Sequence, residues 1–442
     1  MTGPSAPRRA LTQAKSALSV YRDRRLAAIF GLGVASGLPS SLVFATLSIW
    51  LREEGLSRTA IGLFGAVATP YAINFLWAPV LDHARLPVLG ALGRRRSWIV
   101  AVQALLCLAI AAMALADPTA QTAMLALAAF VVAVLSATQD VAIDAYRVEI
   151  LEPETYGAGA AVAVLGWHLG AFASGAGALY VAHAVSWQAA YLGAGVLLAL
   201  LMAVPLLAPE PRSDGIAPRV KRAGEWLRRA VVAPFAEFLG RLGGLAVVVI
   251  GFIVFYKFGE AMLGRMAGVF YVDLAFTKVE IANYAKTVGL AATLLGVVLG
   301  GILCARVRIV TALFAGGIAM ASTNLLFALL AWTGKDHGLL AAAVFLDNLT
   351  AGLATSAFVA FLSGLCNREF TATQYALLAS IGNFARIQLG ALSGWTVDRM
   401  DGDWAAFFVL TTVAVLPGLA LLLIVRRRLP PPPAQPGETS SP

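Results

Sequence analysis

The chain has 442 residues, of which 59% are hydrophobic and only 13% are charged, and its formal net charge is +9. Soluble domains carry about 25% charged residues, so this composition excludes an ordinary water-soluble protein and indicates a protein of the lipid bilayer. The positive charge does not indicate nucleic-acid binding, because the basic residues follow a membrane pattern. Cys107, Cys304 and Cys366 have neither metal-ligand nor disulfide spacing.

Apolar segments long enough to cross the hydrocarbon core follow one another along the chain, since a membrane-spanning helix needs about 20 such residues. Twelve of these segments are predicted, at 26–50, 58–81, 97–116, 119–146, 156–183, 187–208, 243–272, 280–304, 309–333, 339–365, 371–397 and 404–425. Gly37 and Pro39 are expected to interrupt the first of them and to line a cavity.

The polar, basic segment at 209–242 separates the first six predicted helices from the last six. We therefore expect an N-terminal six-helix bundle at 26–208, a cytoplasmic loop, and a C-terminal six-helix bundle at 243–428. Residues 1–25 are expected to be a cytoplasmic tail, because they carry no apolar run of the signal-peptide kind, and Pro-rich 429–442 a disordered one.

The fold class predicted is an all-α membrane protein with twelve transmembrane helices in two six-helix bundles. This arrangement resembles the major facilitator superfamily. The stretch GRRRSW at 93–98, which follows Asp82, also resembles a signature of that superfamily. A positive-inside anchor is the alternative interpretation, and both place the stretch in the cytoplasm.

Lysines and arginines are distributed unequally between the two sides of the predicted helices. With both termini in the cytoplasm, 24 basic residues lie on the cytoplasmic side and five lie outside. Cytoplasmic loops carry the excess of basic residues in membrane proteins, so we expect both termini in the cytoplasm. Only four basic residues remain, and all of them fall within predicted helices.

Asp140, Asp144 and Arg147 form one stripe on a predicted helix, because they are spaced four and three residues apart. Asp144 and Arg147 could form an ion pair near the cytoplasmic end. Asp140 lies about 10 Å deeper. A carboxyl group at that depth that gains and loses a proton suits proton coupling, for which Asp140, Asp144 and Glu260 are the candidates.

Lys257 and Glu260 lie three residues apart in the seventh predicted helix. They could neutralise each other as an intrahelical pair, or the lysine could hold a substrate anion. Arg386 is a stronger anion ligand, because guanidinium binds carboxylate through two hydrogen bonds. The excess of cations in this half indicates an anionic substrate. Arg265, closer to the outer face, could be an entry-side contact or an interfacial anchor, and no role is assigned to Lys286 and Asp347, which also lie at membrane depth.

Polar and aromatic side chains complete the predicted substrate site. The candidates are Gln139, Tyr146, Trp167, His168, Asn348 and Asn383. Amides can bond to sugar hydroxyls and an indole ring can stack on a sugar, although any one aromatic could simply pack in the core. His168 could likewise be a core histidine. No P-loop, dinucleotide-binding or metal motif is present in the sequence, so we expect no cofactor and no enzymatic activity.

Several motifs, in this order and spacing, resemble the AmpG family of muropeptide permeases from about residue 26 to 425. They include GVASGLPSSL, LREEGLSRTAIGLF, INFLWAPVLD, GRRRSW, SATQDVAIDAYR, YKFGEA, VFLDNL and LCNREFTATQYALLAS. The resemblance implies an inner-membrane importer that moves N-acetylglucosaminyl-1,6-anhydro-N-acetylmuramyl peptides from periplasm to cytoplasm, driven by protons. Such import feeds peptidoglycan recycling and, in some bacteria, β-lactamase induction.

By this resemblance, Gln139, Asp140 and Asp144 match the family's S-x-Q-D segment, and Lys257 with Glu260 matches Y-K-x-G-[DE]. LGWHLG departs from the family, which has an arginine after the aromatic residue. The expected partners are the muropeptide, protons and the bilayer, and a monomer is the expected state. The alternatives are a proton-coupled transporter or exporter of another sugar, drug or anionic metabolite, and a sensor without transport.

Overall fold

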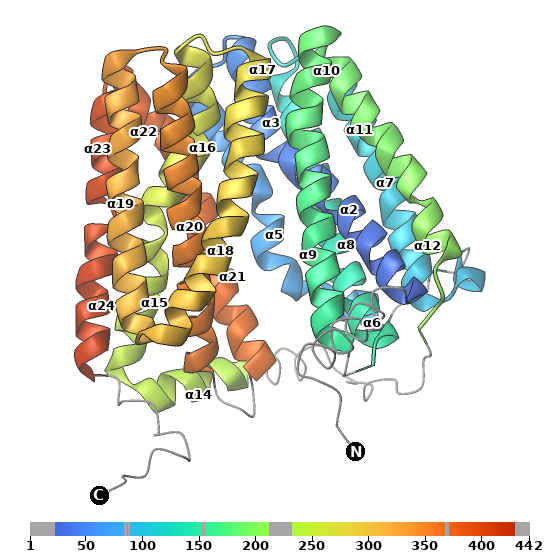
Figure 1. Ribbon diagram of the computed structural model, residues 1–442. Coiled ribbons are helices and arrows are strands. Elements are labelled where there is room, and N and C mark those ends of the chain that lie inside the picture. The colour runs from blue at the N-terminus through green and yellow to red at the C-terminus, as the bar shows by residue number, and fades with distance from the viewer. Residues whose placement is uncertain are drawn as a thin grey trace, which may run out of the picture.

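The structure is a computed structural model, and it describes residues 23–83, 86, 89–152, 155–211, 232–366 and 371–428. All regular elements in these ranges are helices, and they run side by side in two groups (Figure 1). The predicted all-α class is therefore confirmed. The expected tails fall outside the described residues except at 23–25, and so does most of the expected loop at 209–242.

The first half of the chain forms six crossings, several of them divided into shorter helices. They are α2 (Arg24–Val43) with α3 (Ala45–Glu53); α4 (Arg58–Phe64) with η2 (Gly65–Ala68), α5 (Pro70–Ile73) and η3 (Asn74–Leu76); α7 (Arg94–Leu115); α8 (Thr122–Ile150); α9 (Tyr156–Phe172) with η6 (Ala173–Gly177) and α10 (Ala178–Ala184); and α11 (Trp187–Leu201) with α12 (Ala203–Leu207). The short elements α6 (Ala78–His83) and η4 (Gly90–Leu92) join the second crossing to the third.

The second half repeats this plan after α14 (Ala233–Leu242). Its crossings are α15 (Gly244–Tyr256) with α16 (Phe258–Asp273); α17 (Lys278–Ile281) with η8 (Ala282–Val288) and α18 (Gly289–Arg306); α19 (Ile309–Thr333); α20 (His337–Leu365); α21 (Thr371–Ala391) with α22 (Ser393–Arg399); and α23 (Trp404–Val413) with α24 (Leu416–Arg428).

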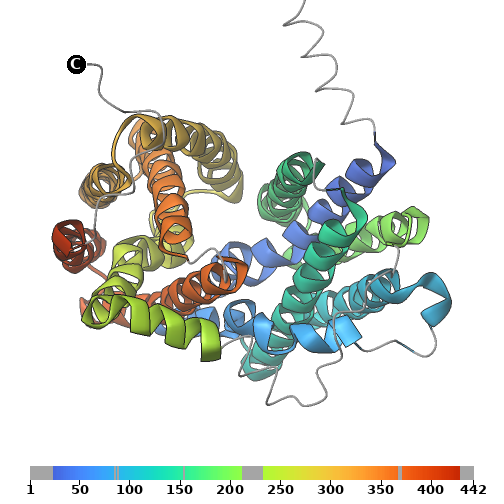
Figure 2. The same cartoon turned by 90° about the horizontal axis from the view of Figure 1, so that it is seen from below.

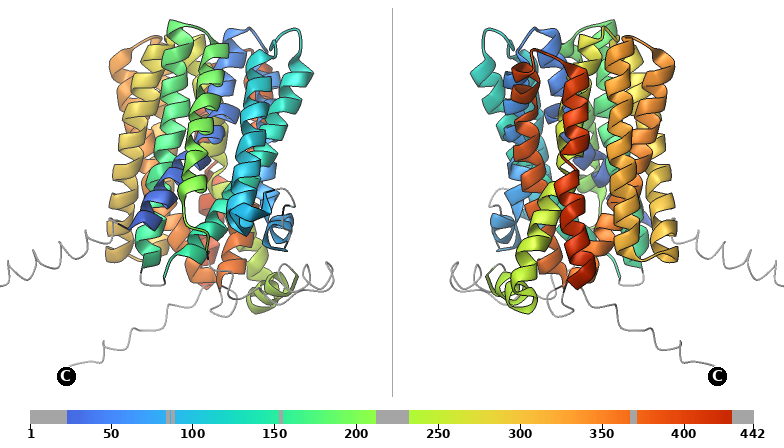
Figure 3. Two further views of the ribbon diagram at one scale, coloured as in Figure 1. Left: turned by 90° about the vertical axis from the view of Figure 1, so that its right-hand side faces the viewer. Right: turned by 90° about the vertical axis from the view of Figure 1, so that its left-hand side faces the viewer.

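Eleven of the described crossings are long and apolar enough to span a membrane, by length and composition alone. The remaining one, α21 with α22, is more polar, because α21 carries Asn383, Arg386 and Gln388. The chain is a multi-pass membrane protein, and its crossings agree with the predicted segments to within a few residues. Side views show the crossings as long, roughly parallel helices (Figure 3).

The interruption expected at Gly37 and Pro39 lies elsewhere. Both residues are inside the continuous helix α2, and the first crossing breaks at Phe44, whose φ and ψ are −94° and −91°. Pro39 removes one backbone donor, but the hydroxyl of Ser40 donates to the carbonyl of Gly37 at 2.7 Å and adds a bond within that turn. The prediction of a break at Gly37 and Pro39 was therefore wrong.

Glycines allow helices within each half to approach closely. A Cβ added at Gly37 would lie 2.0 Å from the carbonyl oxygen of Trp167, and one at Gly170 would lie 2.1 Å from that of Val34. The α18–α20 contact in the second half is built similarly, since a Cβ at Gly296 would lie 2.1 Å from the carbonyl oxygen of Leu349. Small residues at such contacts are typical of membrane helix packing, and these contacts hold each half together.

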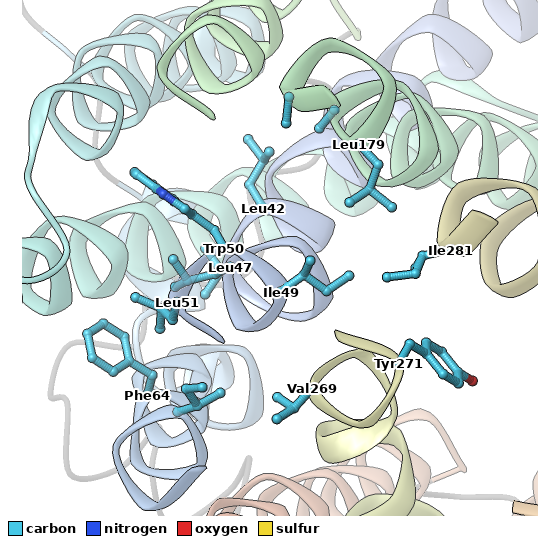
Figure 4. Close-up of a cluster of buried hydrophobic side chains, with 14 of the residues drawn as sticks. Leu42, Leu47, Ile49, Trp50, Leu51, Phe64, Leu179, Val269, Tyr271 and Ile281 are labelled. Carbon is cyan, nitrogen blue, oxygen red and sulfur yellow. The ribbon is translucent and has the colours of Figure 1, made fainter. Parts of the chain in front are cut away.

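The two halves meet through an apolar core at the end drawn at the top of Figure 1, which we call the upper end. Figure 4 shows Ile49 of α3, from the first half, between Val269 of α16 and Ile281 of α17, from the second. Figure 2, drawn from the opposite, lower end, shows the halves as two groups of helices that adjoin where α21 lies beside the second crossing. The upper end is therefore packed shut.

Candidate functional site

A cavity of about 220 Å³ lies among the helices of the second half. Its lining comes from α16, α20 and α21, together with Lys257 between α15 and α16. The lining residues are Lys257, Glu260, Phe358, Ala379, Gly382, Asn383 and Arg386. Four predicted site residues therefore share one cavity. Because known small-molecule pockets hold about 300–1,000 Å³, this cavity is large enough for only part of a disaccharide peptide.

Lys257 lies where the seventh crossing breaks, ending α15 and preceding α16. Its Nζ atom is 2.5 Å from Oε2 of Glu260 and donates to the hydroxyl of Thr355 on α20 at 2.9 Å. The ion pair predicted as one alternative is therefore present, although Lys257 lies at the break between the two helices and not inside one. Both side chains nevertheless line the cavity, so the pair is available to a ligand.

The bond between Ser36 and Asp140 in the first half corresponds to the bond between Lys257 and Thr355 in the second. The hydroxyl of Ser36 on α2 donates to the Asp140 carboxylate at 2.6 Å, and among the described residues no cation forms an ion pair with it. Ser36 precedes Lys257 by 221 positions and Asp140 precedes Thr355 by 215, so the two bonds join equivalent helices of the two halves. A partly buried carboxylate without a cation is the arrangement that favours proton uptake.

Asp144 lies in a different environment from Asp140. Its carboxylate is 3.0 Å from the guanidinium of Arg147, and 68% of its side chain is exposed. The ion pair that the spacing predicted is thus present. An exposed, paired carboxylate has little need to take up a proton, so the geometry favours Asp140 over Asp144 for proton coupling.

Two predicted substrate contacts are buried in this conformation and do not line the cavity described above. Gln139 and Tyr146 are fully buried on α8, and the Tyr146 hydroxyl donates to the carbonyl of Pro209 at 2.7 Å. Their direct contact with substrate stays a prediction, and it would require a conformation in which these side chains are accessible. Successive residues of an α-helix point about 100° apart, so Gln139 and Asp140 lie on different faces of α8. The face that carries Gln139 is turned toward the protein interior.

Trp167 and His168 remain partly accessible on α9, with ring centroids 5.1 Å apart. Nδ1 of His168 contacts the carbonyl oxygen of Val164 at 2.9 Å, a bond within its own helix. Asn348 instead joins two helices, because its amide oxygen accepts from Thr293 on α18 at 3.1 Å. Asn348 thus contributes to the contact between α18 and α20, and its substrate role stays a prediction.

Two acid–tryptophan–cation trios close the upper end. In the first, the carboxylate of Glu53 accepts from the indole of Trp187 at 2.8 Å and pairs with Lys278 of the other half at 2.8 Å. The ammonium of Lys278 also lies 5.4 Å from the Trp187 ring centroid. Glu53 ends the first crossing, and its carboxylate binds both Trp187 of its own half and Lys278 of the other half, so the trio joins the halves.

The second trio is the same arrangement with the halves exchanged. Asp273 accepts from Trp404 at 3.0 Å and pairs with Arg58 of the other half at 2.6 Å, and the Arg58 guanidinium lies 5.4 Å from the Trp404 ring centroid. Arg52 adds a further bond to Asp273 at 2.5 Å. The acids stand 220 positions apart in the sequence, the cations 220 and the tryptophans 217. The two trios are therefore related by the internal repeat.

Sequence reasoning missed these trios, although their residues are visible in it. Ser57 and Thr277 cap the helices that carry the two cations, and Ser186 and Asp403 cap those that carry the two tryptophans. The available signal was the repeat of these caps at nearly the same separation, 220 positions for Ser57 and Thr277 and 217 for Ser186 and Asp403. The contact itself joins residues more than 130 positions apart, which local patterns do not report.

The stretch GRRRSW connects three helices of the first half at the lower end. Arg95 pairs with Glu149 of α8 at 2.6 Å, and Glu210 after α12 accepts from the backbone N–H groups of Arg95 at 2.8 Å and Arg96 at 3.2 Å. Gly93 precedes this helix with φ of +97°, and an added Cβ would lie 2.3 Å from the Glu210 carboxyl carbon. The stretch therefore ties α7 to α8 and α12 as well as carrying positive charge.

Replacing Glu210 by alanine is expected to lower the melting temperature of the purified protein. The Glu210 carboxylate caps the first turn of α7, and losing such a cap costs about 1–2 kcal/mol of stability. The measurement is thermal unfolding in detergent, with Glu152→Gln as the control, because Glu152 forms only an exposed pair with Arg25. Equal melting temperatures for both variants would contradict the capping role.

Two helical halves that are packed shut at one end and enclose charged groups at membrane depth define a membrane transporter. Residues 29–387 match the model of the Major Facilitator Superfamily. The chain is 39% identical over 407 residues to the anhydromuropeptide permease of Escherichia coli strain K12, covering 92% of this chain and 80% of that protein. A Rickettsia felis relative named among the AmpG transporters is 33% identical over 405 residues, covering 91% of this chain and 97% of that protein.

Solved structures agree on the fold. A bacterial homologue of the human lysosomal transporter Spinster, inward-facing and occupied, has a TM-score of 0.69 at 13% identity and covers 92% of this chain and 97% of its own. A D-xylose–proton symporter has a TM-score of 0.66 at 12% identity, covering 90% and 96%. The chain belongs to the Major Facilitator Superfamily and, within it, to the family of the anhydromuropeptide permeases. It is a transporter and not an enzyme.

Proposed function

We propose that this protein imports anhydro-muropeptides, disaccharides with a short peptide stem, in symport with protons. The observation that carries the proposal is the 39% identity, over 92% of the chain, to a protein named anhydromuropeptide permease. Import of this kind returns cell-wall fragments to the cytoplasm for peptidoglycan recycling and, in bacteria with an inducible β-lactamase, supplies the inducing fragment.

The chemistry of the cavity supports such a substrate. Arg386 opens into the cavity and its guanidinium donates only to the amide oxygen of Asn383, at 3.0 Å, among the described residues. Lys257 and Glu260 neutralise each other, so the cavity keeps a net positive charge. Guanidinium binds carboxylates through paired hydrogen bonds, and a muropeptide presents carboxylates on its stem. Asn383 can bond to sugar hydroxyls or to the peptide.

The proposed orientation places the lower end in the cytoplasm, with both termini on that side of the inner membrane. It rests on the excess of basic residues there, 24 against five. The two bundles, at 26–208 and 243–428, are proposed to move relative to each other during transport. Because one chain contains both bundles, a monomer is the proposed functional unit. The upper end then faces the periplasm, and the trios close the protein on that side.

Proton coupling is assigned in this proposal to Asp140, with Glu260 as the second candidate and Asp144 as the third. Asp140 has a hydroxyl donor and no cation among the described residues, so its charge is stabilised only by Ser36. A carboxylate in that position gains a proton when the surroundings close around it and loses it when water returns. That exchange is what symport requires.

The test is uptake of radiolabelled anhydro-muropeptide into membrane vesicles with an imposed pH gradient, with a protonophore as control. We expect accumulation above the external concentration that the protonophore abolishes. Uptake that only reaches the external concentration would contradict proton coupling, but it would not affect the substrate assignment. No uptake of muropeptide, with uptake or export of another sugar or anionic metabolite, would overturn the substrate assignment.

A further inference from the structure

Arg265 of α16 reaches out of its own half and into the other. Its guanidinium lies against Gly65 of η2, where an added Cβ would be 2.5 Å from Nη2. Nη1 is 3.3 Å from the hydroxyl of Ser48 on α3, and the guanidinium carbon is 5.5 Å from the ring centroid of Phe44. Any larger residue at position 65 would displace this side chain from its present place.

No carboxylate pairs with Arg265 among the residues that the structure describes, and its one hydrogen-bond partner is the Ser48 hydroxyl. The arginines at the upper end differ in this respect, because Arg52 and Arg58 both pair with Asp273. A cation at membrane depth without an anion is strongly disfavoured unless a ligand or a watery cavity compensates it. A negatively charged group of the substrate could therefore supply the counter-ion that Arg265 lacks.

A second arginine lies on the neighbouring helix α21. Arg386 lines the cavity from α21, one turn before Gly390, and a Cβ at Gly390 would lie 3.9 Å from the Cβ of Arg265. Both side chains are positively charged, and among the described residues neither forms an ion pair with a carboxylate. Two neighbouring arginines without an acid between them favour the binding of an anion, which compensates their charges and accepts hydrogen bonds from both.

We propose that Arg265 and Arg386 together form a carboxylate subsite at the upper end of the cavity, and that Arg265 sets the preference for substrates with an acidic stem. This inference rests on the proposed function and specifies which part of the substrate binds there. The carboxylate bridges Arg386 on α21 and Arg265, which is held against η2 and α3. The bound anion thereby links the second half to the first.

The experiment compares two labelled substrates: one anhydro-muropeptide with free stem carboxylates and the same compound with those carboxylates amidated. The wild type is expected to transport the free acid with the higher kcat/KM. Arg265→Gln is expected to lower kcat/KM for the free acid by about 10- to 100-fold, the usual loss of a charge-assisted hydrogen bond. Transport of the amide should change by less than about threefold, because neutral amides gain little from a guanidinium.

Three further variants complete the test. Arg386→Gln should reproduce the loss of preference, and it serves as the second variant if Arg265→Gln does not insert. Arg265→Lys should retain part of the preference, because the charge remains while the paired hydrogen bonds are lost. Arg399→Gln removes an exposed arginine of α22 and should leave both rates unchanged.

The outcomes separate this inference from the proposed function. Equal loss for both substrates in Arg265→Gln would show a structural role at the contact between the halves and overturn the subsite. Equal transport of acid and amide by the wild type would also overturn it, while muropeptide import stands. If the wild type transports neither compound, the proposed function fails and the subsite assignment fails with it.

Discussion

Asp140→Asn is expected to abolish accumulation of substrate driven by a pH gradient, down to the level of vesicles without the protein. Asparagine keeps the size of the side chain and can still accept from the Ser36 hydroxyl, which donates to Asp140 at 2.6 Å. It cannot take up or release a proton. Substrate can then cross without a proton, but the gradient no longer drives it.

Counterflow distinguishes this loss from a loss of folding. Vesicles preloaded with unlabelled substrate should still exchange it for labelled substrate through the Asp140→Asn variant, because exchange needs no net proton movement. Asp144→Asn is the matched control, since its carboxylate is paired with Arg147 and mostly exposed. If the Asp140→Asn variant still accumulates substrate, proton coupling must be assigned to Glu260 instead. If the variant loses both accumulation and counterflow, Asp140 contributes to substrate binding or packing and not to proton coupling alone.

Asp273→Asn is expected to shift the protein away from the conformation closed at the upper end. The Asp273 carboxylate accepts from Arg52, Arg58 and Trp404, and only 11% of its side chain is exposed. Removing one partner of a buried ion pair costs about 3 kcal/mol or more. That free energy corresponds to roughly a hundredfold change in the ratio of closed to open molecules.

The measurement is the distance distribution between spin labels at Ala120 and Thr333, which are exposed at the upper end of opposite halves. A longer distance should grow in Asp273→Asn, and a smaller shift in the same direction is expected for Glu53→Gln, whose carboxylate pairs with one cation instead of two. Asp401→Asn removes an exposed acid of the same end and should leave the distribution unchanged. Unchanged distances in both trio variants would mean that apolar packing alone closes this end.

Local patterns were sufficient for the helices and for contacts within one helix. The crossings were predictable because apolar length is a property of a continuous segment, and the bonds between Lys257 and Glu260 and between Asp144 and Arg147 follow from helical spacing. The first crossing was less predictable. A proline at position 39 indicated a break, but α2 continues through this position, where it packs closely against α9, and the chain bends at Phe44 instead.

The sequence by itself determined a membrane protein with repeated six-helix halves, an excess of charge at one end, and charged residues at membrane depth. Only the tertiary structure decided which of those charges meet. Arg265 lies against Gly65, and Glu53 pairs with Lys278, across 200 and 225 positions of chain respectively. Helical periodicity reports neighbours within a few turns, whereas such contacts depend on how the two halves dock, which a single sequence does not encode in any local pattern.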